Sequence, residues 1–541
     1  MKSTISKDSK MPDTSNPSIS PPNFEHVFTR GYMPYVWFFV IIFAVYAQTL
    51  FFGFTSLDDW YLISARQEFL RNPLNIFEAF RENIYGLYYR PLLTISFIID
   101  TVIGRGSFVM YHFTNLVLHF AGTAILYVLL KELGGSKKFA FCFASIFAAH
   151  PILTSSVSWV PGRNDSMLGV FVFSAFLMLV KYVKTQKNLH LVLFTLLAAA
   201  SMFTKESAIG MVIIFPAYIL LFGFNEFKVK NVLRKKFALP VVFLYASVFV
   251  WFLCRSMFAG SVELSDKAQM ITEGISKIVP AFFQYLGKLI IPVNNSGVTY
   301  FEPFSIYFGV FIFVCLACLI PFAKIKNKKL LALGALWIFL FIAPPIFQKT
   351  PYVLEHRMYV VFAGIAMIMG ALTFNFSKKF FLCLWAVFLV FYMCIAGLNA
   401  QKFKNEQLFA SSVILQSPSL AAALYIAGEV SLSENGFEMA HHFFKRGVEL
   451  EPHNSDLNFF IGFIYWAWGN FDKSREHLIR ALERNPTRHQ GWAILANIAI
   501  NDNNPALAVY YMENALRHNP QDKQYLMQFE TYREIKYALE K

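Results

Sequence analysis

Long apolar runs alternate with short polar segments along the first four hundred residues of the chain. Each run is about 20 residues long, the length that a helix needs to cross about 30 Å of hydrocarbon. Eleven such runs lie near residues 33–53, 108–130, 138–158, 165–183, 188–203, 207–224, 237–256, 304–323, 330–347, 357–376 and 380–400. The pattern predicts an all-α polytopic membrane domain of about eleven transmembrane helices.

Two segments of this part of the chain do not fit the spanning pattern. The apolar stretch 91–104 is too short to cross and carries Asp100, so we interpret it as interfacial or re-entrant. Residues 1–32 are polar and rich in Ser and Pro, without the n-region, h-region and cleavage site of a signal peptide. We expect them to form a disordered cytoplasmic tail, and we expect the helical domain to cover 33–403, with outer loops at 54–107 and 257–303.

From about residue 404 the pattern changes to mixed-charge, amphipathic helices with an internal repeat. Pro452, Pro486 and Pro520 are 34 residues apart, which is the period of tetratricopeptide repeats. Counting back from each proline gives repeats at about 421–454, 455–488 and 489–522, with a capping helix at 523–541. The sequence therefore predicts an α-solenoid over 404–541. Such arrays bind peptides or partner proteins; a purely structural appendage is the alternative.

Charge adds an orientation to this architecture. Hydrophobic residues make up 56% of the chain and charged ones 15%, well below the roughly 25% of a soluble protein. Lys and Arg outnumber Asp and Glu by 48 to 34, and the surplus lies in the short turns after the even-numbered spans. By the positive-inside rule these turns are cytoplasmic. Membrane topology, rather than a nucleic-acid partner, thus explains the surplus of Lys and Arg. This topology predicts a cytoplasmic N-terminus and places the repeats outside.

Candidate chemistry gathers in the loops that this topology places outside. Asp58 and Asp59 follow the first span directly, where an ionised carboxylate is costly unless it has a purpose. We interpret them as catalytic. The candidate phosphate-binding cations are Arg90, Arg163, Lys205 and Arg357. The candidate supporting residues are His112, His119, His150, Asn164, Glu206 and His356.

Carboxylates beside several cations at a membrane surface suit a lipid-linked phosphosugar as substrate. Cations hold the phosphate and stabilise its charge as the sugar leaves, and a carboxylate takes a proton from the incoming hydroxyl. The second aspartate orients the acceptor or holds a divalent metal ion, and the sequence leaves that choice open. Plainer interpretations also exist: the aspartates as a helix N-terminus, His112 and His119 as packed between helices or bonded to backbone, and Arg163 and Arg357 as snorkelling anchors.

The order of these motifs resembles a known family. An Asp–Asp pair is followed by RPL, by NLVLH, and by HPILTSSVSWVPGRND, the most specific segment. TKE, YLGKLIIPVNNSGVTY, HRMY and the repeats come after it. This order is similar to that of the transmembrane and tetratricopeptide-repeat O-mannosyltransferases, within the C-type glycosyltransferase superfamily. In an R-Y-x-Y motif of that superfamily, Arg357 matches the arginine, whereas Met358 replaces the aromatic residue.

The resemblance implies an inverting glycosyltransferase that uses a polyprenyl-phosphate sugar, with protein Ser or Thr as acceptor bound through the repeats and Asp58 at the acceptor. No cofactor besides this co-substrate and the metal ion is expected. Alternatives are a transferase or ligase with a lipid or glycan acceptor, a transporter, and a non-catalytic membrane-anchored scaffold. The short array is typical of a bacterial inner-membrane relative with periplasmic repeats, which would be lumenal in a eukaryote.

Overall fold

A computed structural model describes residues 24–55, 58–223, 235–259, 264–292, 301–346, 353–373, 377–417 and 420–539. Nearly all of these residues are helical. The long helices of the first part are α1 (Met33–Tyr46), α6 (Phe108–Glu132), α7 (Lys137–Ala149), α9 (Arg163–Thr185), α10 (Asn188–Thr204), α11 (Met211–Tyr218), α12 (Lys235–Phe258), α13 (Leu264–Ile290), α14 (Pro303–Leu319), α15 (Lys328–Ile346), α16 (Met358–Ala371) and α17 (Lys378–Ala400).

Shorter pieces connect or extend these helices. The short α-helices are α2 (Asp58–Leu62), α3 (Gln67–Arg71), α4 (Asn75–Glu78), α5 (Pro91–Gly104) and α8 (Thr154–Ser158). The 3₁₀ and π turns are η1 (Glu25–Thr29), η2 (Ala47–Phe51), η3 (Ser64–Arg66), η4 (Pro151–Leu153), η5 (Glu206–Gly210), η6 (Ile219–Gly223), η8 (Ile320–Phe322), η9 (Glu355–Arg357) and η10 (Gln401–Phe403). Strands β1 (Lys324–Ile325) and β2 (Leu372–Thr373) pair antiparallel.

The predicted spans all coincide with helices of the structure. In the described part of the chain, seven helices are long and apolar enough to cross a membrane, and α7 with α8, bent by 53°, makes an eighth. The other three predicted spans coincide with α10, α15 and α16, which do not meet this criterion. The all-α membrane fold is confirmed, whereas the count of eleven stays a prediction.

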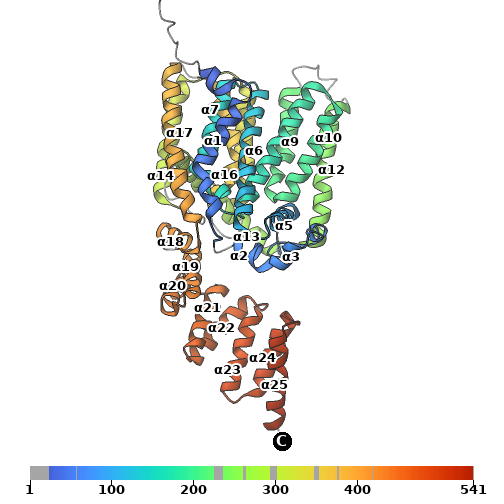
Figure 1. Cartoon of the computed structure of the whole chain (residues 1–541), viewed down its shortest axis with the longest axis vertical. Helices are drawn as coiled ribbons and strands as arrows, with labels where there is room; N and C mark the ends of the chain where they lie inside the picture. The colour runs from blue at the N-terminus through green and yellow to red at the C-terminus, as the bar shows by residue number, and fades with distance from the viewer. Residues whose placement is uncertain are drawn as a thin grey trace, which may run out of the picture.

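The long helices stand side by side in one bundle, with α9 in its interior and α14 and α17 at its edge (Figure 1). The loop predicted at 257–303 contains α13, which packs against α14. α5 lies at one end of the bundle, where Figure 1 shows it nearly end-on beside α2 and α3. This placement agrees with an interfacial segment rather than a span.

The described part of the predicted tail is in contact with the bundle. Phe24 and Phe28 pack edge-on against Trp385 of α17, with ring centroids 5.8 and 6.0 Å apart. Phe28 also contacts Phe141 of α7 at 5.5 Å. Residues 1–23, the greater part of the predicted tail, lie outside the described residues. The packed chain therefore begins before the predicted boundary at residue 33.

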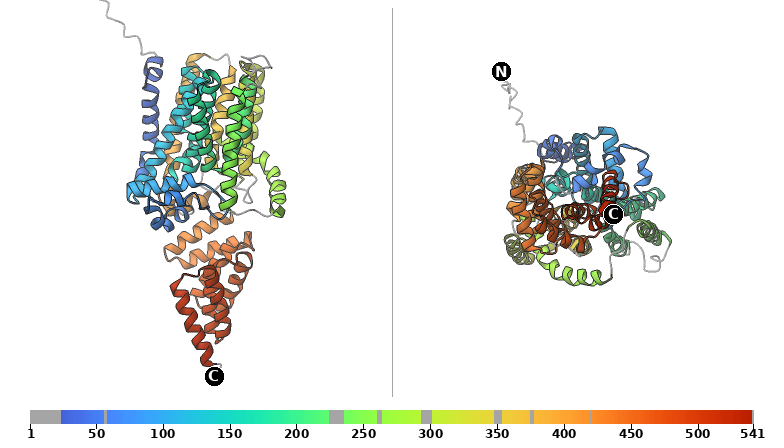
Figure 2. Two further views of the ribbon diagram at one scale, coloured as in Figure 1. Left: turned by 90° about the vertical axis from the view of Figure 1, so that its right-hand side faces the viewer. Right: turned by 90° about the horizontal axis from the view of Figure 1, so that it is seen from below.

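The repeats lie beyond the α2 end of the bundle (Figures 1 and 2). The helices are α18 (Glu406–Gln416), α19 (Ala421–Ser433), α20 (Phe437–Leu450), α21 (Ser455–Ala467), α22 (Phe471–Arg484), α23 (His489–Asn501), α24 (Pro505–His518) and α25 (Lys523–Leu539). Here α18 leads into three antiparallel helix pairs, α19–α20, α21–α22 and α23–α24, and a closing helix, α25. The paired helices meet closely, since a Cβ on Gly462 would lie 2.8 Å from Leu478 Cγ. The predicted solenoid of tetratricopeptide type is confirmed.

Candidate functional site

The polar motifs of the outer loops meet at one end of the helix bundle. α2 and α5 lie at this end, and the repeats extend beyond it, whereas the basic turn between α6 and α7 lies at the opposite end (Figures 1 and 2). The structure therefore separates the candidate site from the basic turns, as the alternation of charge predicts. Which end faces the cytoplasm stays a prediction.

Asp59, in the first turn of α2, is anchored in the interior. Its Oδ2 atom accepts a hydrogen bond from Trp159 Nε1 at 2.8 Å and another from the Thr55 hydroxyl. The side chain is 1% exposed. Burial raises the pKa of Asp59 to about 7, against the lowering effect of the hydrogen bonds from Thr55 and Trp159, and the charge of Asp58 raises it further. Asp59 is thus a fixed, buried carboxyl group.

Asp58 is the more accessible of the two aspartates. It is partly exposed, and its Oδ1 atom accepts a hydrogen bond of 2.6 Å from the Tyr85 hydroxyl. Desolvation raises the pKa of Asp58, whereas Tyr85, Arg90 and Lys205 lower it. The two cations therefore lie in the electrostatic neighbourhood of Asp58, which is the carboxylate that a substrate hydroxyl can reach.

Arg90 stands directly before α5 and holds a carboxylate of its own. Its Nη2 and Nε atoms lie 2.8 and 2.9 Å from Glu206 Oε2, and the Tyr89 amide donates to Glu206 Oε1 at 3.0 Å. In the amide orientation that satisfies its neighbours, Asn164 accepts from Arg90 Nη1 at 2.8 Å. The side chains of Arg90 and Glu206 remain 14% and 24% exposed. This ion pair therefore keeps one side open to solvent.

Lys205 lies in the extended link between α10 and η5. Its Nζ atom donates to Asp165 Oδ2 at 2.6 Å, and Asp165 sits in the first turn of α9, where the helix dipole favours a carboxylate. Burial lowers the pKa of Lys205, and Asp165 raises it. His356 Nε2 lies 3.8 Å from the same Asp165 oxygen. Lys205 therefore has a single close carboxylate partner and is 12% exposed.

His356 and Arg357 belong to η9, and both lie in the electrostatic neighbourhood of Asp165. Burial lowers the pKa of His356 to about 3, so the ring is neutral at pH 7, and its buried Nδ1 atom has no hydrogen-bond partner among the described residues. Arg357 lies within electrostatic reach of Tyr285 and Asp165. We refer to Asp58, Arg90, Asp165, Lys205, Glu206, His356 and Arg357 as the outer charge cluster.

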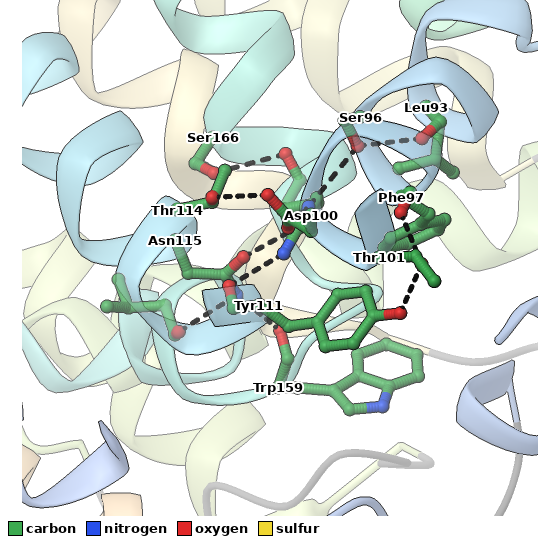
Figure 3. A network of polar contacts seen from close by, with 12 residues as sticks. Leu93, Ser96, Phe97, Asp100, Thr101, Tyr111, Thr114, Asn115, Trp159 and Ser166 are labelled. Atoms are coloured by element: carbon green, nitrogen blue, oxygen red, sulfur yellow. Dashed lines mark hydrogen bonds and ion pairs between the residues drawn. The ribbon is translucent and has the colours of Figure 1, made fainter. Parts of the chain in front are cut away.

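Arg163 was predicted beside these cations, but the structure gives it other neighbours; Figure 3 labels its partners Asp100, Tyr111 and Asn115. Its Nη1 atom contacts Asp100 Oδ2 at 2.5 Å, and its Nη2 atom donates to the Tyr111 carbonyl at 2.6 Å. Its Nε atom donates to Asn115 Oδ1 at 2.9 Å. Arg163 is 0% exposed and Asp100 is 1% exposed. Arg163 is thus bonded at every guanidinium nitrogen and is also fully buried, so it has no side open to a phosphate in this structure.

This buried network also positions the indole that holds Asp59. Asn115 Nδ2 donates to the carbonyls of Val157 and Trp159 at 3.0 and 2.9 Å, and its oxygen receives the Arg163 bond (Figure 3). The network therefore fixes the segment between α8 and α9 that carries Trp159. Arg163 is thus linked to Asp59 through Asn115 and Trp159.

The other three predicted histidines, His112, His119 and His150, lie between packed elements. His119 contacts Tyr359 Oη at 3.1 Å and the Ala148 carbonyl at 3.0 Å. His150 lies at the bend between α7 and η4, where it accepts from the Ile152 amide and contacts the Leu289 carbonyl at 3.0 Å. His112 is 1% exposed and lies 3.5 Å from the Gly53 carbonyl. Their surroundings correspond to the packed alternative given above for His112 and His119.

The prediction omitted several side chains that complete the site. Asp165, Trp159 and Tyr85 each bond a predicted residue directly. Lys288 of α13 is also buried, with its Nζ atom 2.6 Å from Glu355 Oε1 beside His356. A lysine inside an apolar helix is a detectable signal, because a buried cation needs a carboxylate partner. Tyr85 gave no such signal, since an exposed-loop tyrosine is common.

A metal site was predicted only as a possibility. Among the described residues, no group of three or more His, Cys, Asp or Glu side chains is arranged to hold a metal ion. The carboxyl groups of Asp58 and Asp59 turn to different partners, Tyr85 and Trp159. We therefore assign no metal ligands from these residues.

Comparison with known proteins supports the architecture and the family. A family model described as a tetratricopeptide repeat matches residues 455–488. The chain is 30% identical over 181 residues to the protein O-mannosyl-transferase tmtc2 of Xenopus laevis, over 32% of this chain and 21% of the relative. With human TMTC2 it is 29% identical over 178 residues, again over 32% and 21%. With a protein O-mannosyl-transferase of Caenorhabditis elegans it is 23% identical over 387 residues, or 67% and 54%.

The protein is thus of the class that joins a helical membrane domain to tetratricopeptide repeats. Its homologues are protein O-mannosyl-transferases, so the predicted resemblance to the transmembrane and tetratricopeptide-repeat O-mannosyltransferase family is confirmed. The chain matches about a fifth of the length of the two vertebrate relatives and about half of the nematode one.

Proposed function

We propose that this chain is an integral-membrane glycosyltransferase that moves a sugar from a polyprenyl-phosphate donor to a Ser or Thr hydroxyl of a protein. The observation that carries the proposal is the outer charge cluster, in which a reachable carboxylate stands among partly open cations at one end of the bundle. The names of the homologues support mannose as the sugar.

In this proposal Asp58 is the general base. The acceptor hydroxyl oxygen attacks the anomeric carbon, its proton passes to Asp58, and the bond between that carbon and the phosphate oxygen breaks with inversion. The lipid phosphate leaves with the electron pair of this bond. Asp58 suits the role because it is partly exposed, whereas Asp59 is buried and anchored by Trp159. A positioned base of this kind contributes roughly 10²–10⁴-fold to a rate.

We assign the donor phosphate to Arg90, Lys205 and Arg357 and leave Arg163 out. Arg90 and Lys205 each face one carboxylate, Glu206 and Asp165, with one side still open. A phosphate that approaches this side gains charge-assisted hydrogen bonds, which strengthen as negative charge grows on the leaving oxygen.

The repeats supply the acceptor side of the proposal. They extend from the same end of the bundle as Asp58 (Figure 1). Trp159, which holds Asp59, packs in one cluster with Phe409 of α18 and Ile426 of α19. A protein bound along the array would therefore reach the cluster without crossing the bundle. We place this end in the periplasm or an equivalent lumen, following the positive-inside rule.

The test measures transfer of label from radiolabelled polyprenyl-phosphate mannose into the protein fraction of membranes that contain the full chain. We expect the wild type to label protein in an alkali-labile linkage and Asp58→Asn to lose this activity. The matched control is Asp472→Asn, which changes an aspartate of α22 that is 95% exposed. Label in the lipid fraction would favour a lipid or glycan acceptor. Full activity of folded Asp58→Asn would contradict the proposal.

A further inference from the structure

Tyr85 occupies a backbone position that aromatic residues seldom adopt. It is the second residue of a tight turn in which the Leu87 amide donates to the Ile84 carbonyl at 3.1 Å. Tyr85 has φ = +54°, and Gly86 after it has φ = +72°. Positive φ at both central positions is typical of type I′ turns, where Gly, Asn and Asp dominate. A tyrosine here is strained, so the surrounding structure must hold it in place.

The ring of Tyr85 lies against one face of α2. It stacks on Tyr61 with ring centroids 4.2 Å apart and planes 18° apart. Its hydroxyl donates to Asp58 Oδ1 at 2.6 Å. Asp58 and Tyr61 are three residues apart in one helical turn and so share a face. The Tyr85 side chain therefore contacts both the Tyr61 ring and the Asp58 carboxylate of α2.

The turn itself is fastened to the end of α12. Asn83 Nδ2 donates to the Phe258 carbonyl at 2.8 Å, and Arg255 Nη2 donates to the Leu87 carbonyl at 3.1 Å. These two bonds flank Tyr85 on both sides. Because α12 belongs to the helix bundle, the turn is held relative to the bundle, and so is the hydroxyl that reaches Asp58.

We propose that Tyr85 is a positioning residue for Asp58, and this inference rests on the proposed function. The Tyr85 hydroxyl donates its hydrogen bond to Oδ1 of Asp58. The proton of the acceptor hydroxyl therefore passes to the other oxygen, Oδ2. It also stabilises the ionised carboxylate, which is the form that accepts a proton. The strained turn is the means by which a residue of the outer loop, distant in sequence, sets the orientation of the base.

The test compares Tyr85→Phe with the wild type in the mannosyl transfer assay over a range of pH, with transfer rates at varied donor concentration. Phenylalanine keeps the ring and the strained turn and removes only the hydroxyl. We expect kcat to fall on the order of 10-fold at acidic pH and the donor KM to stay unchanged. The acidic limb of the pH profile should move to higher pH, because Asp58 loses a hydrogen bond that favours its ionised form. Tyr61→Phe is the matched control and should leave the limb in place.

A second variant separates positioning from folding. Tyr85→Asn places a residue that accepts positive φ in the turn, so its unfolding temperature should equal or exceed that of the wild type while transfer falls at least as far as in Tyr85→Phe. If the pH profile of Tyr85→Phe superimposes on that of the wild type while Asp58→Asn is inactive, the positioning role is wrong and the proposed function stands. If Asp58→Asn is fully active, both the positioning role of Tyr85 and the proposed function are wrong.

Discussion

Two arginines of this protein each pair with a carboxylate at the same end of the bundle, yet their surroundings differ. Arg163 and Asp100 are 0% and 1% exposed, and all three guanidinium nitrogens of Arg163 are bonded within the chain. Arg90 is 14% exposed and its partner Glu206 is 24% exposed. The first pair is closed on all sides, whereas the second keeps a face toward solvent.

The difference shows what separates a structural cation from a candidate ligand-binding one. A buried pair needs its full set of hydrogen bonds, because the desolvation cost of the charges is otherwise not offset. A partly open pair can exchange or add a partner at little cost, as a phosphate-binding site requires. Sequence assigned both arginines to the donor phosphate, and both are bonded at every guanidinium nitrogen, so the solvent exposure of each pair is what distinguishes them. The predictions below test this distinction.

The largest expected effect is on folding. Arg163→Gln leaves Asp100 buried without its cation, which should cost about 3–5 kcal/mol of folding free energy. We expect the variant to unfold at a markedly lower temperature in detergent, while the fraction that remains folded keeps most of its transfer activity. The measurement is thermal unfolding followed by size-exclusion chromatography, with transfer normalised to folded protein.

The double variant Arg163→Gln with Asp100→Asn provides the control for this prediction. It removes both charges and leaves two side-chain amides in their place, so it should regain part of the lost stability. A single variant Arg163→Gln with the unfolding temperature of the wild type but no transfer would contradict the distinction. It would return Arg163 to the phosphate site, as the sequence suggested.

The next effect is on catalysis. Arg90→Gln removes an open cation from the outer charge cluster, and loss of one electrostatic donor typically costs about 10²–10³-fold in kcat. We expect this loss together with an unfolding temperature close to that of the wild type. Arg81→Gln is the matched control, because Arg81 belongs to the same outer loop, is 68% exposed and contacts only Glu78 three residues away. Transfer by Arg81→Gln should equal that of the wild type.

The architecture was largely predictable from sequence because periodic patterns specify it. The 20-residue apolar runs follow from the thickness of a bilayer, and each coincides with a helix. The spacing of Pro452, Pro486 and Pro520 follows from the size of one helical repeat, and the first helices of the pairs begin at Ala421, Ser455 and His489 with the same period. Patterns of this kind depend on one element at a time and need no knowledge of tertiary contacts.

The candidate site was predictable only in part, because contacts between distant segments define it. Asp58, Arg90 and Lys205 were selected because charges beside apolar spans are unusual, and the structure brings them to one end of the bundle, while their roles stay predictions. The burial of Arg163 was not predicted, because its partner Asp100 lies in α5, a segment outside the spanning pattern. Tyr85 was missed because its relation to Asp58 depends on a left-handed turn, which no spacing in the sequence reveals.

A third prediction concerns the buried aspartate and pH. The folded chain keeps the proton of Asp59 up to about pH 7, whereas an unfolded chain releases it near 3.8. Between these values the folded state binds more protons, so the contribution of Asp59 to stability falls as pH rises. Asp59→Asn removes this dependence and keeps an oxygen for the hydrogen bond from Trp159. We expect a relative gain on the order of 2 kcal/mol at pH 8 compared with pH 5.

The measurement is the difference in unfolding temperature between Asp59→Asn and the wild type at each pH. The same variant should leave the acidic limb of the transfer profile in place below about pH 7, because Asp59 is already neutral there and Asp59→Asn removes no charge beside Asp58. A difference in unfolding temperature that is constant from pH 5 to pH 8 would mean that Asp59 titrates alike in both states. Its burial would then carry no electrostatic cost.

The smallest effect completes the comparison with a third arginine, in the repeats. Arg480 of α22 pairs with Glu476 at 2.7 Å, and the two side chains are 47% and 55% exposed. Exposed pairs four residues apart on a helix contribute about 0.3–0.5 kcal/mol, because water screens them and both side chains lose conformational freedom. Arg480→Ala should therefore leave transfer unchanged and lower the unfolding temperature barely measurably. A loss of transfer in this variant with unchanged stability would instead place Arg480 on the surface that holds the acceptor. Solvent exposure alone would then no longer predict how strongly Arg163, Arg90 and Arg480 each affect transfer.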